Sequence, residues 1–292
     1  MDKKRIFLTS LSAAACLAAL RSGYETSHLK AVYYSASSSK LPEGTNVKIV
    51  FLTDLHCRKY GERNIELLRL VRAQDPDLIL AGGDMVNAEG SYESDNEVLS
   101  LLKALKKIAP VYFALGNHEE YLKAEINRFG GRYKNIEKYL EKAQIPLLAN
   151  SHIDLDNNIS LYGLEISRKY YRRFNNKAPK PSHMEKYLGK PDKSRYNILL
   201  AHDPAFFNSY ETWKGDLVLS GHYHGGIVRL PFLGGVISPY LTFFPDYCVG
   251  EYEKNDTKLI VSAGCGCHDI NFRLFNMPEV SVIELHSEDI KL

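Results

Sequence analysis

The stretch VKIVFLTDLH, residues 47–56, holds a run of largely β-branched, apolar side chains that ends on Asp54 and His56. Four later apolar runs also end on side chains that bind metals; these are Asp84, Asn117 with His118, His202, and His222 with His224. Short runs of this kind between helical segments are typical of buried parallel strands. Because ligands of such sheets bind at the carboxyl ends of the strands, we expect these side chains to meet at one edge. The sequence therefore predicts a two-metal hydrolytic site.

The alternative is that each of these residues is an ordinary loop residue or helix cap. A single His or Asp after a strand usually has such a role. The chain has 10 histidines, however, and five of them directly follow the apolar runs. We therefore favour a metal site over a series of coincidences.

Length and composition set the broad class. The chain has 292 residues, 45% of them hydrophobic and 25% charged, which is enough for one large α/β domain or two small ones. A formal net charge of +2 implies no general affinity for nucleic acid. The five cysteines are odd in number and lack paired C-x₂-C spacing, which argues against a disulfide framework and a structural zinc site.

The N-terminus has the layout of a secretory signal, with basic residues 3–5 before the mostly apolar residues 6–20. The apolar run is short for a membrane span, which needs about 20 residues. We favour a retained membrane anchor over a cleaved signal, and we favour both over a helix buried in the protein or a lipid attached to Cys16. The predicted division is a signal or membrane anchor at 1–22, a polar linker at 23–45 and a catalytic domain at 46–292. The protein is expected to associate with a membrane through its N-terminus, on a side that the sequence leaves open.

Apolar periodicity predicts helices near residues 62–73, 96–107 and 133–143, and further strands near 159–164, 196–200, 217–219, 259–261 and 280–285. The early alternation of strands and helices implies right-handed parallel crossovers. Two segments fit this pattern poorly. Residues 168–196 carry ten Lys or Arg and two acids, a local charge of +8, and residues 230–249 form an apolar loop. Each is either a plain connection or a surface that meets a membrane.

The candidate ligands also indicate the chemistry. Asp, His and Asn suit manganese, iron, zinc or magnesium better than copper. Two metals that lie close together need a bridging carboxylate, and Asp84, after two glycines, is the natural choice. Such a pair makes hydroxide available near neutral pH for in-line attack on phosphorus. His118, beside Asn117, is placed to give the leaving group its proton as a general acid.

Five motifs, in order across about residues 46–285, carry a family resemblance; they are Asp54-x-His56, Gly83-Asp84, Gly116-Asn117-His118-Glu119, His202 and Gly221-His222-x-His224. They resemble the motifs of calcineurin-like metallophosphoesterases. The resemblance implies an α/β fold in which a two-sheet β-sandwich is flanked by helices. It implies that one divalent ion, with manganese favoured, is bound by Asp54, His56 and His224, and a second by Asn117, His202 and His222. Asp84 would bridge the two ions, and His118 would be the catalytic histidine.

The branch of the family is narrowed by what is missing. No Asp-Arg-Gly follows Asp84, as in protein Ser/Thr phosphatases, and Asn87 stands where purple acid phosphatases need Tyr. Residues 222–234 resemble those of membrane-associated bacterial phosphohydrolases, although Tyr223 replaces the usual Thr. Some of that group cleave UDP-2,3-diacylglucosamine in lipid A biosynthesis, and others are envelope phosphodiesterases. The resemblance suggests Arg229 and Arg273 as substrate-binding residues.

Two other readings remain open. A soluble phosphodiesterase or nuclease would use the basic segment 168–196 to bind its substrate. A non-catalytic scaffold on the same fold would be expected to lack His118 or several ligands, and this chain keeps them all. We therefore expect a phosphorylated small molecule or a lipid-linked substrate and a membrane as partners, with nucleic acid disfavoured and no obligate protein partner.

Overall fold

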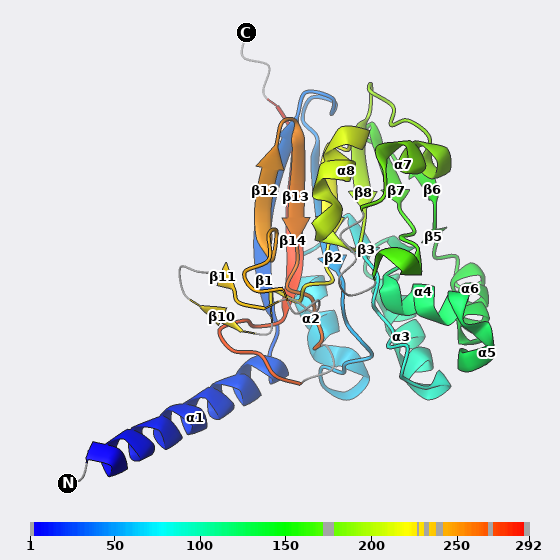
Figure 1. Ribbon diagram of the computed structural model, residues 1–292. Helices are drawn as coiled ribbons and strands as arrows, with labels where there is room; N and C mark the ends of the chain where they lie inside the picture. Colours follow the sequence, from blue (N-terminus) through cyan, green and yellow to red (C-terminus); the bar gives the residue numbers. More distant parts are fainter. Residues whose placement is uncertain are drawn as a thin grey trace.

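The computed structural model describes residues 3–171, 178–226, 228–230, 234–237, 242–267 and 271–288. Its first sheet is built on the early apolar runs and has the strand order β1-β14-β2-β3-β4-β5 (Figure 1). The strands are β1 (Lys30–Ser38), β2 (Asn46–Leu52), β3 (Leu78–Ala81), β4 (Val111–Ala114), β5 (Leu147–Leu148) and β14 (Glu279–Ser287). β2, β3, β4 and β5 are parallel, so their carboxyl ends share one edge.

The second sheet has the order β12-β13-β9-β8-β7-β6. Its strands are β6 (Ser151–Asp154), β7 (Ile159–Gly163), β8 (Tyr196–Leu200), β9 (Leu217–Ser220), β12 (Gly250–Lys254) and β13 (Thr257–Val261). The four central strands are parallel and the two edge strands are antiparallel to their neighbours. A short hairpin of β10 (Arg229–Leu230) and β11 (Gly234–Gly235) follows β9.

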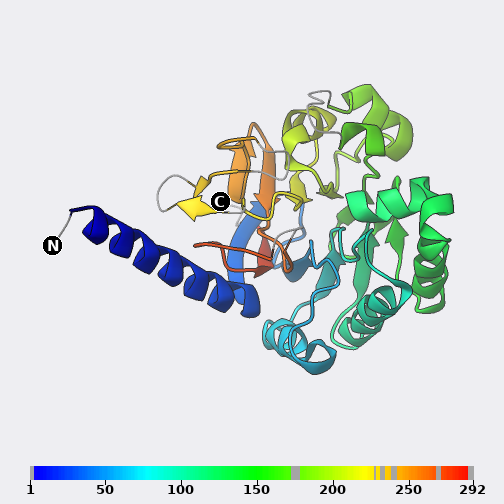
Figure 2. The ribbon, with the colours of Figure 1, turned by 60° about the horizontal axis from the view of Figure 1, so that its bottom comes forward.

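All helices except α1 lie around the two sheets (Figures 1 and 2). The helices are α1 (Lys3–Ser27), α2 (Ile65–Ala73), α3 (Tyr92–Leu105), α4 (Asn117–Ala124), α5 (Ile126–Phe129), α6 (Arg132–Lys142), α7 (Pro181–Leu188) and α8 (Phe207–Trp213), with 3₁₀ turns η1 (Glu62–Asn64), η2 (Arg168–Tyr170) and η3 (Pro204–Phe206). α2, α3 and α6 pack on the first sheet, and α7 and α8 on the second.

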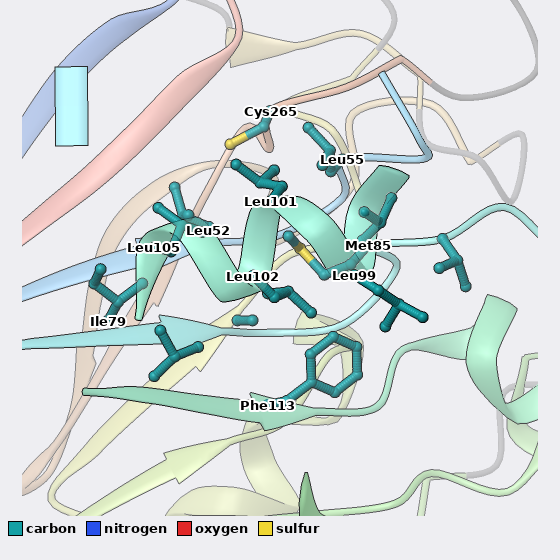
Figure 3. Close-up of a cluster of buried hydrophobic side chains, with 14 of the residues drawn as sticks. Leu52, Leu55, Ile79, Met85, Leu99, Leu101, Leu102, Leu105, Phe113 and Cys265 are labelled. Atoms are coloured by element: carbon teal, nitrogen blue, oxygen red, sulfur yellow. The ribbon is translucent and has the colours of Figure 1, made fainter. Parts of the chain in front are cut away.

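Alternation along β2 explains the layers. Ile49 and Phe51 point into the core between the two sheets, whereas Val50 and Leu52 point to the helices. Figure 3 shows the helix-side core, where Leu99 and Leu102 of α3 lie over the first sheet. A strand buried on both faces reads as a continuous apolar run, which is why the sequence predicted β2, β3, β4, β7, β8 and β9 to within a residue. The predicted ranges for β13 and β14 were two residues short at one end, and β5, β6 and β12 were missed.

The predicted linker at 23–45 is wrong over residues 30–38. These residues form β1, which pairs in parallel with β14 along its whole length. β1 is an edge strand with several exposed positions, where serines are tolerated. Because these serines interrupt the apolar pattern, a search for apolar runs does not detect the strand. Residues 23–27 continue helix α1.

Helix α1 extends away from the rest of the molecule (Figures 1 and 2). It is long and apolar enough to cross a membrane, although a signal sequence would pass the same test. Only 6% of its most apolar window is buried, so the reading of an N-terminal helix buried in the protein is wrong. The end of the helix differs, because Ser22, Glu25 and Thr26 are buried and form hydrogen bonds with the loop residues Arg273, Asn276 and Arg58.

Candidate metal centre

Loops at the carboxyl ends of five parallel strands carry the predicted site. They hold Asp54 and His56 after β2, Asp84 after β3, Asn117 and His118 after β4, His202 after β8, and His222 and His224 after β9. All eight residues are buried. The loops of the first sheet therefore meet those of the second.

Unusual backbone angles aim several of these side chains inward. Asp54, His56, Asp84, His222 and His224 all have a positive φ, between 48° and 66°. This left-handed conformation is uncommon for residues other than glycine, and clusters of it occur at functional sites. Each of the loops after β2, β3 and β9 therefore carries at least one candidate ligand in this conformation.

Two glycines allow these loops to approach one another. A Cβ atom added at Gly221 would lie 2.1 Å from Oδ2 of Asp54, and one added at Gly116 would lie 2.2 Å from Oδ1 of Asp84. Any side chain at either position would push a candidate ligand out of place. Both glycines belong to the motifs found in the sequence.

The first group of potential ligand atoms comes from Asp54, His56 and His224. Nε2 of His56 lies 3.1 Å from Nε2 of His224, which lies 3.4 Å from Oδ1 of Asp54. Two nitrogen ligands at about 2.1 Å from one ion lie roughly 3.0–3.4 Å apart. The spacing of the two imidazoles fits a shared cation.

The second group comes from Asp84, His202 and His222. Oδ2 of Asp84 lies 3.1 Å from Nε2 of His202 and 3.8 Å from Nε2 of His56. Asp84 therefore lies between the two groups, as a carboxylate shared by two ions must. A third, overlapping group joins His56 and Asp84 with His118.

Buried polar atoms at this site lack hydrogen bonds. Within the described residues, Oδ1 of Asn117 is buried without such a partner, and Oδ2 of Asp84 and Nε2 of His202 lie 3.1 Å from each other without the geometry of a hydrogen bond. Buried oxygens and nitrogens rarely remain unsatisfied, so these atoms fit a cation at the same place. Nδ1 of His202 lies 2.9 Å from the carbonyl oxygen of Gly82, which leaves the lone pair of Nε2 for the site.

Similarity to known proteins extends over the part of the chain that carries these site residues. Residues 47–226 match the model of the family described as calcineurin-like phosphoesterase. The chain belongs to this family. It is similar to an uncharacterized metallophosphoesterase of Aquifex aeolicus, 29% identical over 89% of this chain and 93% of that one. It is also similar to the uncharacterized metallophosphoesterase YkuE of Bacillus subtilis, 26% identical over 97% of this chain and 98% of that one.

Among solved structures, TT1561 of Thermus thermophilus aligns with 75% of this chain and 90% of its own. The identity is 12% and the TM-score 0.46. The family assignment depends on the sequence match, and with the clustered Asp and His residues it indicates a dinuclear divalent metal centre in a metal-dependent phosphoesterase.

Electrostatics in this metallophosphoesterase favour bound cations. Burial raises the pKa of Asp84, but the imidazoles of His202, His118 and His56 more than offset this and lower it well below its usual range. Burial lowers the pKa of His202, yet the carboxylates of Asp84 and Asp54 raise it to about 10. A proton and a divalent ion compete for such a nitrogen, so metal binding there releases a proton.

The orientation of His118 is set by its Nδ1 atom, which accepts a hydrogen bond from the backbone N–H of Ala88 (2.9 Å). The ring proton of neutral His118 therefore lies on Nε2. The backbone N–H of His118 in turn donates to Oδ1 of Asp84 (2.8 Å). His118 is thus placed by the same carboxylate that lies between the two ligand groups.

Glu119 is the last residue of the Gly116–Glu119 motif, and its role is seen in the structure. Its side chain is fully buried and accepts hydrogen bonds from the backbone N–H groups of Asp84, Met85, Val86 and Gly116. It therefore ties the loop after β3 to the loop after β4. The sequence signal for this role is that Glu119 directly follows the candidate site residues Asn117 and His118.

The two predicted substrate-binding arginines lie in different surroundings. Arg229 is half-buried on β10, close enough to Cys248 for its charge to oppose the burial that raises the pKa of this thiol to about 11. Its role in substrate binding stays a prediction. Arg273 is 2% exposed, and its guanidinium donates to the backbone carbonyls of Ala263 (2.7 Å) and Gly266 (2.5 Å). These contacts tie Arg273 to the loop of residues 263–266, and its role in substrate binding also stays a prediction.

The basic segment reaches the site through its first residues. The ring of Tyr171 lies 5.3 Å from that of His222, and the guanidinium of Arg168 lies 5.2 Å from the ring of Tyr121. Tyr121 in turn lies 6.2 Å from His118. Residues 172–177 of this segment, and 231–233 and 238–241 of the apolar loop, are outside the described residues.

Proposed function

We propose that this chain is a membrane-anchored metallophosphoesterase that hydrolyses a phosphodiester or pyrophosphate bond in a lipid-linked or envelope substrate, with UDP-2,3-diacylglucosamine as the first compound to test. The observation that carries the proposal is the position of α1. Its apolar part projects outward, while its buried end contacts Arg58, in the loop that bears His56, and the loop of residues 273–276, which lies against His224. Anchor and site are therefore on one side of the molecule.

We assign the metal-binding roles as follows. Asp54, His56 and His224 would hold one ion, Asn117, His202 and His222 would hold the other, and Asp84 would be shared by both. Carboxylate, amide and imidazole donors suit manganese, iron, zinc or magnesium, and we propose manganese as the first metal to test. When bound, the two ions lower the pKa of a water molecule and neutralise charge on the phosphoryl oxygens.

His118 performs the chain's own part of the chemistry. Its Nε2–H is the group that can donate toward the leaving oxygen, because Nδ1 is occupied by Ala88. Gly116 keeps the chain close to Asp84, and Glu119 keeps the two loops together, so the imidazole holds a defined position relative to the phosphate.

The surface around α1 supports a substrate held in a bilayer. Tyr24 and Phe275 are about half exposed at the base of α1, and Arg21 lies against both rings. Phe243 and Phe244, in the loop after the last ligands, are 68% and 57% exposed. Exposed aromatic side chains with a nearby cation are typical of membrane–water interfaces. Residues 3–21 are accordingly proposed as a retained anchor, and the folded domain begins with β1 rather than at residue 46.

The test compares full-length protein on two substrates. Hydrolysis of UDP-2,3-diacylglucosamine in detergent micelles and of bis(p-nitrophenyl) phosphate in solution is measured with manganese, with His118→Ala as the control for contaminating activity. We expect membrane fractionation and a higher kcat/KM for the lipid-linked pyrophosphate. Cytosolic fractionation with a preference for soluble nucleotides would replace this proposal with a soluble phosphodiesterase.

A further inference from the structure

The last turn of α1 is buried in the metal centre's surroundings, unlike the rest of the helix. We call residues 22–27 the docked turn. Glu25 is 0% exposed, and Ser22 and Thr26 are each 5% exposed. The exposed part of α1 needs no such contacts to serve as an anchor, so the docked turn has a separate reason to be there.

One route runs from Glu25 to His224. Oε2 of Glu25 accepts a hydrogen bond from the backbone N–H of Asn276 (2.9 Å), and Oε1 accepts one from Nε of Arg21 (2.6 Å). The side-chain Nδ2 of Asn276 donates to the backbone carbonyl of His224 (2.6 Å) and also to that of Gly226. Glu25 therefore fixes the residue that holds the backbone of a candidate ligand.

A second route runs from Ser22 to Asp54. Oγ of Ser22 accepts from the backbone N–H of Arg273 (3.2 Å). The Arg273 guanidinium holds the carbonyl of Gly266, whose own N–H donates to the backbone carbonyl of Asp54 (2.6 Å). In the same loop, a Cβ atom added at Gly264 would lie 2.6 Å from Cβ of Asp54. This loop therefore packs directly on the Asp54 side chain.

A third contact reaches the loop that bears His56. The guanidinium of Arg58, two residues after His56, donates to the carbonyl of Thr26 in the docked turn and to Oδ1 of Asn271 (2.7 Å). Two routes end on Asp54 and His224, and the third ends on Arg58, two residues after His56. Asp54, His56 and His224 are the members of one ligand group, which leaves out Asn117, His202 and His222.

We infer that the docked turn positions one of the two metal sites, with Glu25 as its main positioning residue. The inference rests on the two-metal site of the proposed function but not on its substrate. A buried carboxylate costs free energy unless it is paired, and Glu25 is paired by Arg21 and by an N–H of the site loop. Loss of a group that orients a ligand typically weakens metal affinity by about 10–100-fold.

The test measures metal binding to full-length protein in detergent after chelation, by titration with Co²⁺ followed by calorimetry and visible absorption. For Glu25→Ala we expect the dissociation constant of one of the two ions to rise by about 10–100-fold, with a changed absorption spectrum for that ion only. Glu25→Gln keeps an oxygen that accepts from Asn276, so it should restore affinity to within a few-fold of wild type. Ser22→Ala is a milder second variant that should weaken the same ion.

Glu251→Ala is the matched control. Glu251, on β12, is also a glutamate in an ion pair, and its partner is Lys258 on β13. The Glu251→Ala variant should bind both ions as wild type does. The inference fails if Glu25→Ala and Ser22→Ala bind both ions normally, or if both ions weaken equally along with the melting temperature. Wild-type protein that binds a single ion would overturn the two-metal site itself, whereas normal binding without lipid-linked hydrolysis would overturn only the proposed substrate.

Discussion

Nε2 of His56 and Nε2 of His224 lie 3.1 Å apart, although the residues are 168 positions apart in the chain. Each follows a parallel strand of a different sheet, so their approach depends on how the two sheets pack. The pair makes the metal centre a joint product of both sheets. Damage to the inter-sheet core should therefore affect metal binding as well as stability.

Asp84→Asn tests the shared carboxylate. Wild-type protein loaded with manganese should contain about two ions per chain by elemental analysis. The variant should lose at least one ion and nearly all activity, because an amide offers one neutral oxygen in place of two charged ones. The exposed residue Asp246 serves as a control when changed in the same way. Full metal content in active Asp84→Asn would contradict the bridging role.

His118→Ala should lower kcat by about 10²- to 10⁴-fold while metal content stays near wild type. If Nε2–H delivers a proton, the loss should be smaller for substrates with an acidic leaving group, such as nitrophenolate, than for alkyl esters. Steady-state kinetics on a series of leaving groups measures this. An equal loss across the series would mean that His118 only hydrogen-bonds the phosphate.

Arg132→Ala should destabilise the protein by about 3–5 kcal/mol, because it leaves a buried carboxylate without its partner. Arg132 and Asp95 are 4% and 0% exposed, and the guanidinium makes two 2.7 Å hydrogen bonds to that carboxylate. Urea unfolding measures the change. The exposed pair of Arg128 and Glu89 is the comparison, and Arg128→Ala should cost about 1 kcal/mol or less. Similar losses in the two variants would contradict the argument from burial.

Glu120 predicts a pH dependence of stability. Burial raises the pKa of Glu120 to about 7; Glu165 adds to this, while the N–H of Arg168 and the charge of Lys123 oppose it. An acid whose pKa is raised by folding binds its proton more tightly in the folded state, so stability falls as pH rises from about 4.5 to 7.

Glu120→Gln removes the carboxyl group that titrates. Its free energy of unfolding, relative to wild type, should rise between about pH 5 and 7 and then level off. Urea unfolding of both proteins at several pH values with saturating metal measures the difference. A constant difference across that range would show that Glu120 titrates normally.

Much of the site was predictable because strand ends are marked by where apolar runs stop. Asp84 after Ile79–Ala81, for example, lies where a buried strand must leave the core. The backbone contacts of Arg273 were not predictable in this way, because an arginine beyond a glycine-rich loop looks the same in the sequence whatever its side chain contacts. Glu25 and Asn276 lie 251 positions apart, and no local pattern links them. Contacts of this kind follow from packing, which periodicity does not encode.

Gly23 lies in α1 between the exposed apolar part and Glu25, and a Cβ atom there would meet nothing within 4 Å. Glycine weakens a helix by about 0.5–1 kcal/mol relative to alanine, so α1 bends most easily at this position. A helix in a bilayer of unsuitable thickness responds by tilting. Bending at Gly23 would reduce the part of such a tilt that passes through Glu25 to Asn276 and His224. We expect Gly23→Ala, which stiffens this joint, to make manganese affinity depend on the acyl-chain length of the surrounding lipid, while the wild-type protein stays insensitive to it.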